Sequence, residues 1–230
     1  MSPYPRRKHS AVMRAHLRLA GARVADVGCG DGALVRFMTR EGAQVTGIEC
    51  GETQLERARA AEPAGGERYI EGRGEALPLG DGSLDIVVLF NSLHHVPIEA
   101  QGKALAEAAR ALRPAGLLYI LEPLAEGAYF ELMRPVDDET EVRARAYEAL
   151  RAAVAEGLFE ETAEERYAAR FKYESFAECK ENSLAVDPTR RAAFEEHEAA
   201  MTQAFEAAAE KHEGAYWFDD PSRLNLARRR

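Results

Sequence analysis

The strongest constraint on the fold is an apolar run that breaks into a turn with glycine at every second position, Val24-Ala25-Asp26-Val27-Gly28-Cys29-Gly30-Asp31-Gly32. An amphipathic stretch with apolar residues at helical spacing follows it. Glycine lets the backbone approach a ligand closely or adopt positive φ. The N-terminus of a helix offers unpaired N–H groups and a partial positive charge. The pattern therefore predicts a strand, a glycine loop and a helix, an arrangement typical of nucleotide-binding sites.

Two carboxylates refine this prediction. Asp26 lies inside the apolar run, where a carboxylate is costly unless it has a partner. Glu49 ends the next apolar run, residues 44–48, at the place where a ribose diol would be held by paired hydrogen bonds. The alternative interpretations are that Asp26 accepts hydrogen bonds from loop amides and that Glu49 is a solvated strand end.

The glycine spacing bears on which nucleotide fits. The dinucleotide fingerprint is G-x-G-x-x-G, whereas here the glycines fall at 28, 30 and 32. Asp31 also lies where a pyrophosphate would approach the helix, and the two like charges would repel each other. A ligand with no phosphate and a cationic centre fits better, and S-adenosylmethionine (SAM) is such a ligand.

These two motifs carry a family resemblance. V-A-D-V-G-C-G-D-G resembles the first motif of class I (Rossmann-like) SAM-dependent methyltransferases, and V-T-G-I-E resembles their ribose-binding strand. The resemblance implies an α/β fold, a doubly wound, mainly parallel seven-stranded sheet with helices on both faces. It divides the single domain into an N-terminal entrance helix (1–20), a SAM-binding core (21–125) and a C-terminal part (126–230) that completes the sheet and forms the wall of the substrate pocket.

Residues 72–79 form the stretch expected to hold adenine. Many relatives read G-D-A-E-x-L-P-F there, with the aspartate on the adenine amino group, whereas this chain has Arg73 at that position. Arginine has no acceptor for an amino group, so Glu75, backbone groups or stacking of Arg73 would replace it. The residues expected to bind SAM are Asp26, Gly28, Cys29, Gly30, Glu49, Cys50, Gly74, Glu75, Ala76 and Asn91.

A continuous apolar run over 86–90 reads as a central strand buried on both faces. F-N-S-L-H-H-V at its end resembles the small-molecule branch of the superfamily, the ubiquinone and menaquinone biosynthesis type (methyltransferase domain type 11). Ligands bind beyond the carboxyl ends of such strands. We expect Asn91 to orient the acceptor and His94, or else His95, to take its proton. Both histidines could equally be structural, and because adjacent side chains are expected to point apart, no metal site is predicted.

The stretch L-R-P-A-G-L-L-Y-I-L-E-P resembles the family's next turn and strand. Glu122 at its end either faces the substrate or pairs with an arginine. The residues predicted to bind substrate are Tyr4, His9, His95, Glu122, Tyr129 and Arg134.

Beyond residue 127 the resemblance fades. Apolar spacing predicts a helix over 138–156, and alternation predicts a strand over 167–173. Asp187 and Pro188 predict the cap and first turn of a helix that runs to about His212. A last strand over 216–218 and a solvated tail of three arginines complete the chain.

Composition limits the partners. The net charge of −9 argues against non-specific binding to nucleic acid or membranes. Three widely spaced cysteines predict neither a disulfide framework nor a metal cluster, and no segment is apolar enough to cross a membrane. We therefore expect a cytoplasmic protein, a monomer or homodimer, whose partner is a small-molecule methyl acceptor.

The predicted function is transfer of a methyl group from SAM to O, N or C of a small molecule by in-line displacement, with S-adenosylhomocysteine as the product. The alternatives are a non-catalytic SAM-binding relative that acts as a partner subunit and an NAD(P)-dependent oxidoreductase. The glycine spacing and Asp31 argue against the oxidoreductase.

Overall fold

The structure is a computed structural model that describes residues 2–230, and it divides into two compact units. The larger unit holds residues 12–122, 142–165 and 223–230. The smaller unit holds residues 2–11, 123–141 and 166–222. The predicted domain boundaries stay a prediction.

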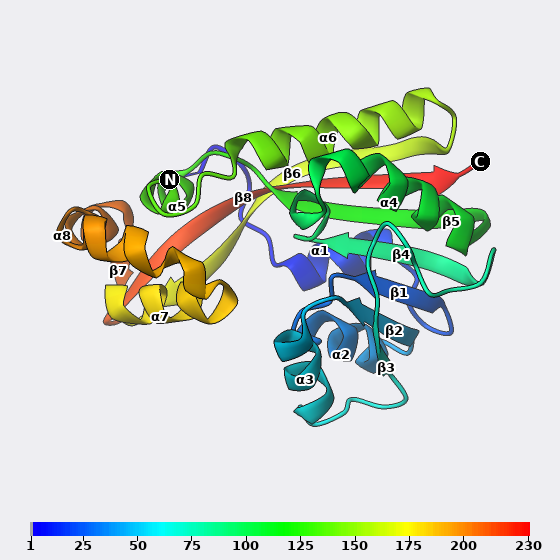
Figure 1. Cartoon of the computed structure of the whole chain (residues 1–230), viewed down its shortest axis with the longest axis horizontal. Coiled ribbons are helices and arrows are strands. Elements are labelled where there is room, and N and C mark those ends of the chain that lie inside the picture. The colour runs from blue at the N-terminus through cyan, green and yellow to red at the C-terminus, as the bar shows by residue number, and fades with distance from the viewer. Residues whose placement is uncertain (1) are drawn as a thin grey trace. The chain divides into compact units, whose positions relative to one another are not determined.

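The strands form one sheet in the order β3-β2-β1-β4-β5-β8-β6, with β7 paired antiparallel to β8. Strands β1 to β5 pair in parallel. Along the chain, α2 lies between β1 and β2, α3 between β2 and β3, and α4 between β4 and β5 (Figure 1). The predicted α/β fold with a mainly parallel sheet is thus confirmed. The sheet has eight strands instead of seven, because the short β7 adds a hairpin to β8. The strands are β1 (Arg23–Val27), β2 (Gln44–Glu49), β3 (Arg68–Glu71), β4 (Leu84–Phe90), β5 (Leu112–Pro123), β6 (Phe159–Tyr173), β7 (Glu210–His212) and β8 (Ala215–Arg229).

The helices are of ordinary length and are joined by short loops. They are α1 (His9–His16), α2 (Ala33–Arg40), α3 (Glu52–Ala60), α4 (Ile98–Ala111), α5 (Ala128–Met133), α6 (Thr140–Ala155), α7 (Phe176–Val186) and α8 (Arg191–Ala208), with 3-10 turns at η1 (Leu93–His95) and η2 (Pro188–Arg190).

Alternation along the strands sends side chains to two buried faces of the sheet in the larger unit. On one face Val27, Ile48, Leu89 and Ile120 pack against α4 and against the part of α6 in this unit. On the other face, a Cβ at Gly47 would lie 3.0 Å from a methyl group of Val35 in α2. Because helices cover both faces, the central strands β1 and β4 are largely buried and apolar, as is usual for parallel strands.

The C-terminal half differs from the prediction in several elements. β6 begins at Phe159, eight residues before the predicted strand, and α7 was not predicted. Asp187 does act as a cap, accepting from the N–H of Thr189, but it caps the η2 turn, and α8 begins at Arg191. The predicted arginine tail is wrong for Arg229, which lies in β8 and donates to the carbonyl of Leu112.

Aromatic rings build the core of the smaller unit. Phe205 and Phe218 have ring centroids 5.2 Å apart, and Tyr129 lies 4.7 Å from Phe171. The Tyr129 hydroxyl lies 3.0 Å from the hydroxyl of Tyr173. Burial raises the pKa of Tyr173 to about 12, so both hydroxyls stay protonated at neutral pH. Within residues 2–230, no helix combines the length and apolar character needed to span a bilayer.

Gly47 offers a test of the packing between β2 and α2. A Cβ there would lie 2.8 Å from the Cys29 sulfur and 2.9 Å from a ring carbon of Tyr69. Both distances are shorter than real Cβ atoms adopt, so a neighbour would have to move. We expect Gly47→Ala to lower the free energy of unfolding by about 1–3 kcal/mol because the site is already filled. Gly102→Ala in α4, where a Cβ meets open space, should instead raise it by about 0.5–1 kcal/mol. Urea denaturation of both variants measures the contrast, and equal effects would show that Gly47 is not constrained by packing.

Candidate functional site

The glycine loop follows β1 as predicted and turns on three residues with positive φ. Gly28, Gly30 and Gly32 have φ of 75°, 55° and 77°. The N–H groups of Gly28 and Cys29 both donate to the carbonyl of Ile48, at 2.8 and 3.1 Å. The loop is therefore anchored to the end of β2.

Glu49 ties the same two strand ends together with its side chain. One carboxylate oxygen accepts from the N–H of Gly30 at 2.9 Å, and the other accepts from the N–H of Gly51 at 2.8 Å. Its alternative interpretation as a purely solvated strand end is therefore wrong. Cys50, the next residue, is exposed. Partial desolvation, together with the charge of the neighbouring Glu49, raises the pKa of its thiol.

Asp26 is the most unusual group in the larger unit. Its side chain is 1% exposed, and its Oδ1 has no hydrogen-bond partner among the described residues. Burial, with a smaller contribution from the charge of Glu49, raises the pKa of Asp26 to about 7. A buried acceptor without a partner can bind a hydrogen-bond donor of a ligand. A cationic donor would stabilise the ionised carboxylate most.

The turn after β4 packs directly against the glycine loop. The Ser92 hydroxyl donates to the carbonyl of Val27 at 2.6 Å. A Cβ on Gly28 would lie only 2.6 Å from the Ser92 Cβ, so this contact excludes any side chain at position 28. The carboxyl ends of β1 and β4 therefore lie next to each other within the larger unit, as expected for neighbouring parallel strands.

Asn91 stands at the start of this turn in a strained conformation. Its φ is 52°, a left-handed value that asparagine tolerates better than most residues. Its Oδ1 is buried without a hydrogen-bond partner in the described part of the chain. Strain and an unpaired polar atom at a strand end are typical of a ligand site.

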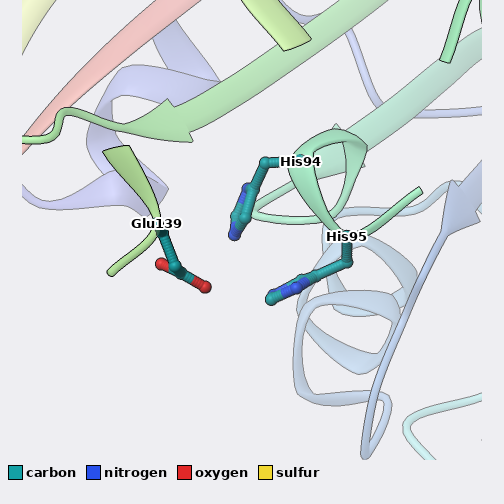
Figure 2. Close-up of side chains that lie close together, drawn as sticks. All are labelled: His94, His95 and Glu139. Carbon is teal, nitrogen blue, oxygen red and sulfur yellow. The ribbon is translucent and has the colours of Figure 1, made fainter. Parts of the chain in front are cut away.

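The two histidines differ in exposure. His94 is 4% exposed, whereas His95 is exposed. Their ring centroids lie 4.0 Å apart at an interplanar angle of 43°, and Figure 2 shows the two rings side by side. The expectation that adjacent histidines point apart is therefore wrong, because the η1 turn brings both rings to the same side.

Glu122 explains the orientation of His94. It is 2% exposed; one carboxylate oxygen contacts Nδ1 of His94, and the other accepts from the N–H of Leu93 at 2.9 Å. The predicted alternative of an arginine partner is wrong, since the partner is a histidine. Glu122 also does not face outward, because both of its oxygens serve the η1 turn.

The loop expected to hold adenine is fixed from behind by Arg110 of α4. Its guanidinium donates to the carbonyls of Leu77 and Leu79 and pairs with Glu107 at 2.8 Å. Glu107 in turn accepts from the N–H of Leu77, and the guanidinium beside it lowers the pKa of its carboxyl group.

Along the loop, a Cβ at Gly74 would pack 3.5 Å from Val27, while Glu75 is half-buried and Arg73 and Ala76 are exposed. Arg73 therefore offers its side chain at the surface.

Four residues predicted to bind substrate belong to the smaller unit. The His9 imidazole lies 2.8 Å from the Tyr167 hydroxyl, and burial lowers its pKa to about 4. Tyr129 belongs to the aromatic core, Arg134 pairs with Glu131 at 3.1 Å, and Tyr4 is half-buried. Their role in substrate binding stays a prediction.

Asp31 closes the start of α2 to phosphate. Its carboxylate accepts from the N–H of Ala33 at 3.0 Å, which places a negative charge on the first turn of the helix. A pyrophosphate would lose this N–H group and meet a like charge. The geometry therefore favours a ligand without phosphate at this loop, as the sequence predicted.

A protein-family model described as a methyltransferase domain matches residues 25–120. These residues are similar to that domain and make up less than half of the chain. The match runs from β1 into β5 and includes the glycine loop, Glu49 and the η1 turn. SAM is the cofactor that this family assignment implies.

Curated relatives agree with this assignment. The chain is 38% identical over 117 residues to the 27-O-demethylrifamycin SV methyltransferase of Amycolatopsis mediterranei, a match that covers 47% of this chain and 42% of the relative. It is 38% identical over 110 residues to the ubiquinone biosynthesis O-methyltransferase of Nitrosococcus oceani, covering 46% of each chain. The match thus spans less than half the length of these relatives.

Solved structures extend the likeness of fold to almost the whole chain. The SAM-dependent methyltransferase of Mesorhizobium loti aligns over 95% of this chain and 96% of its own, with a TM-score of 0.57 and 20% identity. The [4+2]-cyclase SpnF aligns over 96% of this chain and 80% of its own, with a TM-score of 0.63 and 20% identity. The same fold therefore serves a protein named for another reaction, so activity must be argued from the site.

Two features of the site were missed from the sequence. Ser92 was not singled out, although it fixes the distance between the glycine loop and the η1 turn. The pairing of Glu122 with His94 was also missed, because the two residues are 28 positions apart. The parallel pairing of β4 with β5 could have indicated it, since neighbouring strands end at the same edge of a sheet.

Asp26 predicts an unusual dependence of stability on pH. Its pKa is raised in the folded protein, from 3.8 to about 7. Its contribution to stability is therefore fully present below about pH 4 and is lost as the pH rises to about 7. Relative to wild type, we expect Asp26→Asn to gain roughly 2–3 kcal/mol in free energy of unfolding between pH 5 and pH 8 in the absence of ligand. Urea denaturation at both pH values measures this, and parallel pH profiles would contradict it.

Proposed function

We propose that this chain transfers a methyl group from SAM to a small-molecule acceptor. The family match over residues 25–120 supports the reaction. The two relatives described above are named for methylation of oxygen, which favours an oxygen acceptor here as well. The observation that carries the proposal is the buried, unpartnered carboxylate oxygen of Asp26 beneath the glycine loop.

The donor set fits the amino-acid part of SAM. A protonated amino group would give Asp26 Oδ1 the hydrogen-bond partner that the described residues lack. It would also favour the ionised form of Asp26, whose pKa burial holds near 7. The absence of phosphate from SAM agrees with the carboxylate of Asp31 at the start of α2.

Glu49 fits the ribose. Its two oxygens already accept from backbone N–H groups on either side, which holds the carboxylate still. Each carboxylate oxygen has a second lone pair, so a vicinal diol can donate to both without breaking those bonds. The loop over residues 72–79 would contact the adenine, with Glu75 and backbone groups as acceptors.

SAM supplies a methyl group on a sulfonium, so an acceptor lone pair can form the new bond while the C–S pair stays on sulfur. The protein then has to align the acceptor and exclude water. Asn91 offers an unpaired Oδ1 to orient a donor on the acceptor. His94 lies on the turn that packs against the glycine loop through Ser92, so we assign it the role of base.

The alternatives predict different binding. An oxidoreductase would bind NADH, yet the glycine loop lacks the spacing and the open helix start for a pyrophosphate. A non-catalytic partner subunit would bind SAM but transfer nothing. The oriented His94 favours an enzyme, since a binding subunit has no use for a histidine fixed by a buried carboxylate.

Calorimetric titration with S-adenosylhomocysteine tests the cofactor site. We expect binding to the wild type, and we expect Glu49→Gln to weaken it by about tenfold or more because a charged acceptor becomes neutral. Glu71→Gln is the matched control, since Glu71 pairs with Glu49 in register at the end of β3 and is exposed. Its dissociation constant should match that of the wild type. Binding of NADH, or no binding of S-adenosylhomocysteine, would overturn the proposal.

A further inference from the structure

The smaller unit contains a cavity of about 240 Å³, formed by the N-terminal segment, the start of α5, the end of α8, β7 and β8. None of its lining residues is among those predicted to bind cofactor or substrate. Because a cavity of roughly 150 Å³ can hold benzene, this one has room for a molecule of about ten non-hydrogen atoms. It is therefore large enough for a small organic ligand.

The walls of the cavity are largely apolar and tightly packed. Gly127 has φ of 98°, and a Cβ there would lie 3.1 Å from the ring of Pro221. Trp217 lines another wall, and the guanidinium carbon of Arg170 lies 4.8 Å from the centroid of its ring. Residues 126–128 are exposed, so the cavity is open to solvent on that side. A largely apolar hollow with a few polar groups is the usual form of a small-molecule site.

The charges around the cavity favour a cation. Arg6 donates to Asp219 at 2.8 Å and to Glu210 at 3.0 Å, and Arg170 pairs with Glu210 at 2.6 Å. These two guanidinium groups compensate the carboxylates of Asp219 and Glu210. Glu126, at the open side, is exposed and has no ion pair within residues 2–230. One uncompensated negative charge remains there, and it would attract a cationic group and repel an anion.

Trp217 adds an unpaired donor. Its Nε1–H is buried and has no hydrogen-bond partner in the described part of the chain. The N–H group of a buried tryptophan usually has a partner, and a buried donor without one is costly. An acceptor atom on a ligand would remove this cost.

We propose that this cavity binds a small organic cation that combines an apolar body with one hydrogen-bond acceptor, such as a carbonyl oxygen. The cationic group lies beside Glu126, the apolar body packs against the walls, and the acceptor takes the hydrogen of Trp217 Nε1. The site uses residues of the smaller unit alone and is independent of methyl transfer.

The tryptophan provides a direct readout. Trp217 is the only tryptophan of the chain, so its indole N–H gives a single ¹H–¹⁵N signal. The probe is para-(aminomethyl)benzamide, which has an ammonium group, a ring and a carbonyl oxygen. We expect it to bind with a dissociation constant in the low millimolar range and to move the indole signal to lower field, since a new hydrogen bond deshields the proton. An indole signal that stays in place would overturn the proposal.

Three analogues separate the contributions of the probe's groups. Para-methylbenzylamine lacks the acceptor, so it should bind more weakly and should not move the indole signal to lower field. Para-toluamide lacks the cation and should also bind more weakly. Para-carbamoylbenzoate replaces the cation by an anion and should show no binding. Equal affinity for the anion and the cation, or the same low-field shift without the acceptor, would contradict the proposed ligand class.

Glu126→Gln tests the charge at the open side of the cavity. We expect it to weaken binding of the cationic probe about threefold, as for an exposed ion pair, and to leave binding of para-toluamide unchanged. Glu206→Gln is the matched control, because Glu206 in α8 is likewise exposed and has no ion pair among the described residues. Its dissociation constants should equal those of the wild type. An equal loss in both variants, or no loss in Glu126→Gln, would show that Glu126 does not hold the cation.

Ala128→Phe tests the location of the site. Ala128 lines the cavity and is exposed, so a ring there should occupy the space without disturbing the fold. We expect binding of the probe to fall at least about tenfold, because a filled cavity has no room for the ligand. The other backbone ¹H–¹⁵N signals should keep their dispersion, which reports an intact fold. Undiminished binding to folded Ala128→Phe would place the probe elsewhere and refute the proposal.

Discussion

The cost of burying the carboxylate of Asp26 shapes the whole site. Asp26 and Glu49 face the glycine loop from neighbouring strands, and their mutual repulsion adds to the desolvation of Asp26. Glu49 is stabilised by two backbone N–H groups, while Asp26 keeps one oxygen without a partner. The folded chain therefore holds an unfavourable electrostatic free energy at the loop, and a cationic ligand would reduce it. Such an arrangement reduces stability in order to gain affinity, as strained functional sites commonly do.

A second buried carboxylate, Glu122, is treated differently. It has a titratable partner in His94 and a backbone donor in Leu93, so its burial is compensated within the fold. The contrast between the two acids is informative. A carboxylate that is fully partnered serves to place another side chain, whereas one with an open oxygen serves to receive a ligand. The same residue type thus has two roles, set by what surrounds it.

Much of the larger unit could be predicted from the sequence because its signals are local. The glycine loop, the buried strand over 86–90 and the acid at the end of β2 each follow from a short stretch with a physical reason for its pattern. The pairing of Glu122 with His94 could not be found in this way, since it depends on the register between strands. The smaller unit was predicted less well. α7 has few buried side chains, so its apolar periodicity is weak, and charged and polar residues interrupt β8 along its length.

The contact between Gly28 and Ser92 has an evolutionary consequence. No side chain fits at position 28 while Ser92 is in place, and the serine hydroxyl bonds to the backbone that leads into the loop. Position 28 therefore cannot gain a side chain while Ser92 keeps its own. This contact couples the glycine loop to the turn that carries His94. Adaptation to new acceptors must then come from segments outside this pair, where substitutions leave the contact intact.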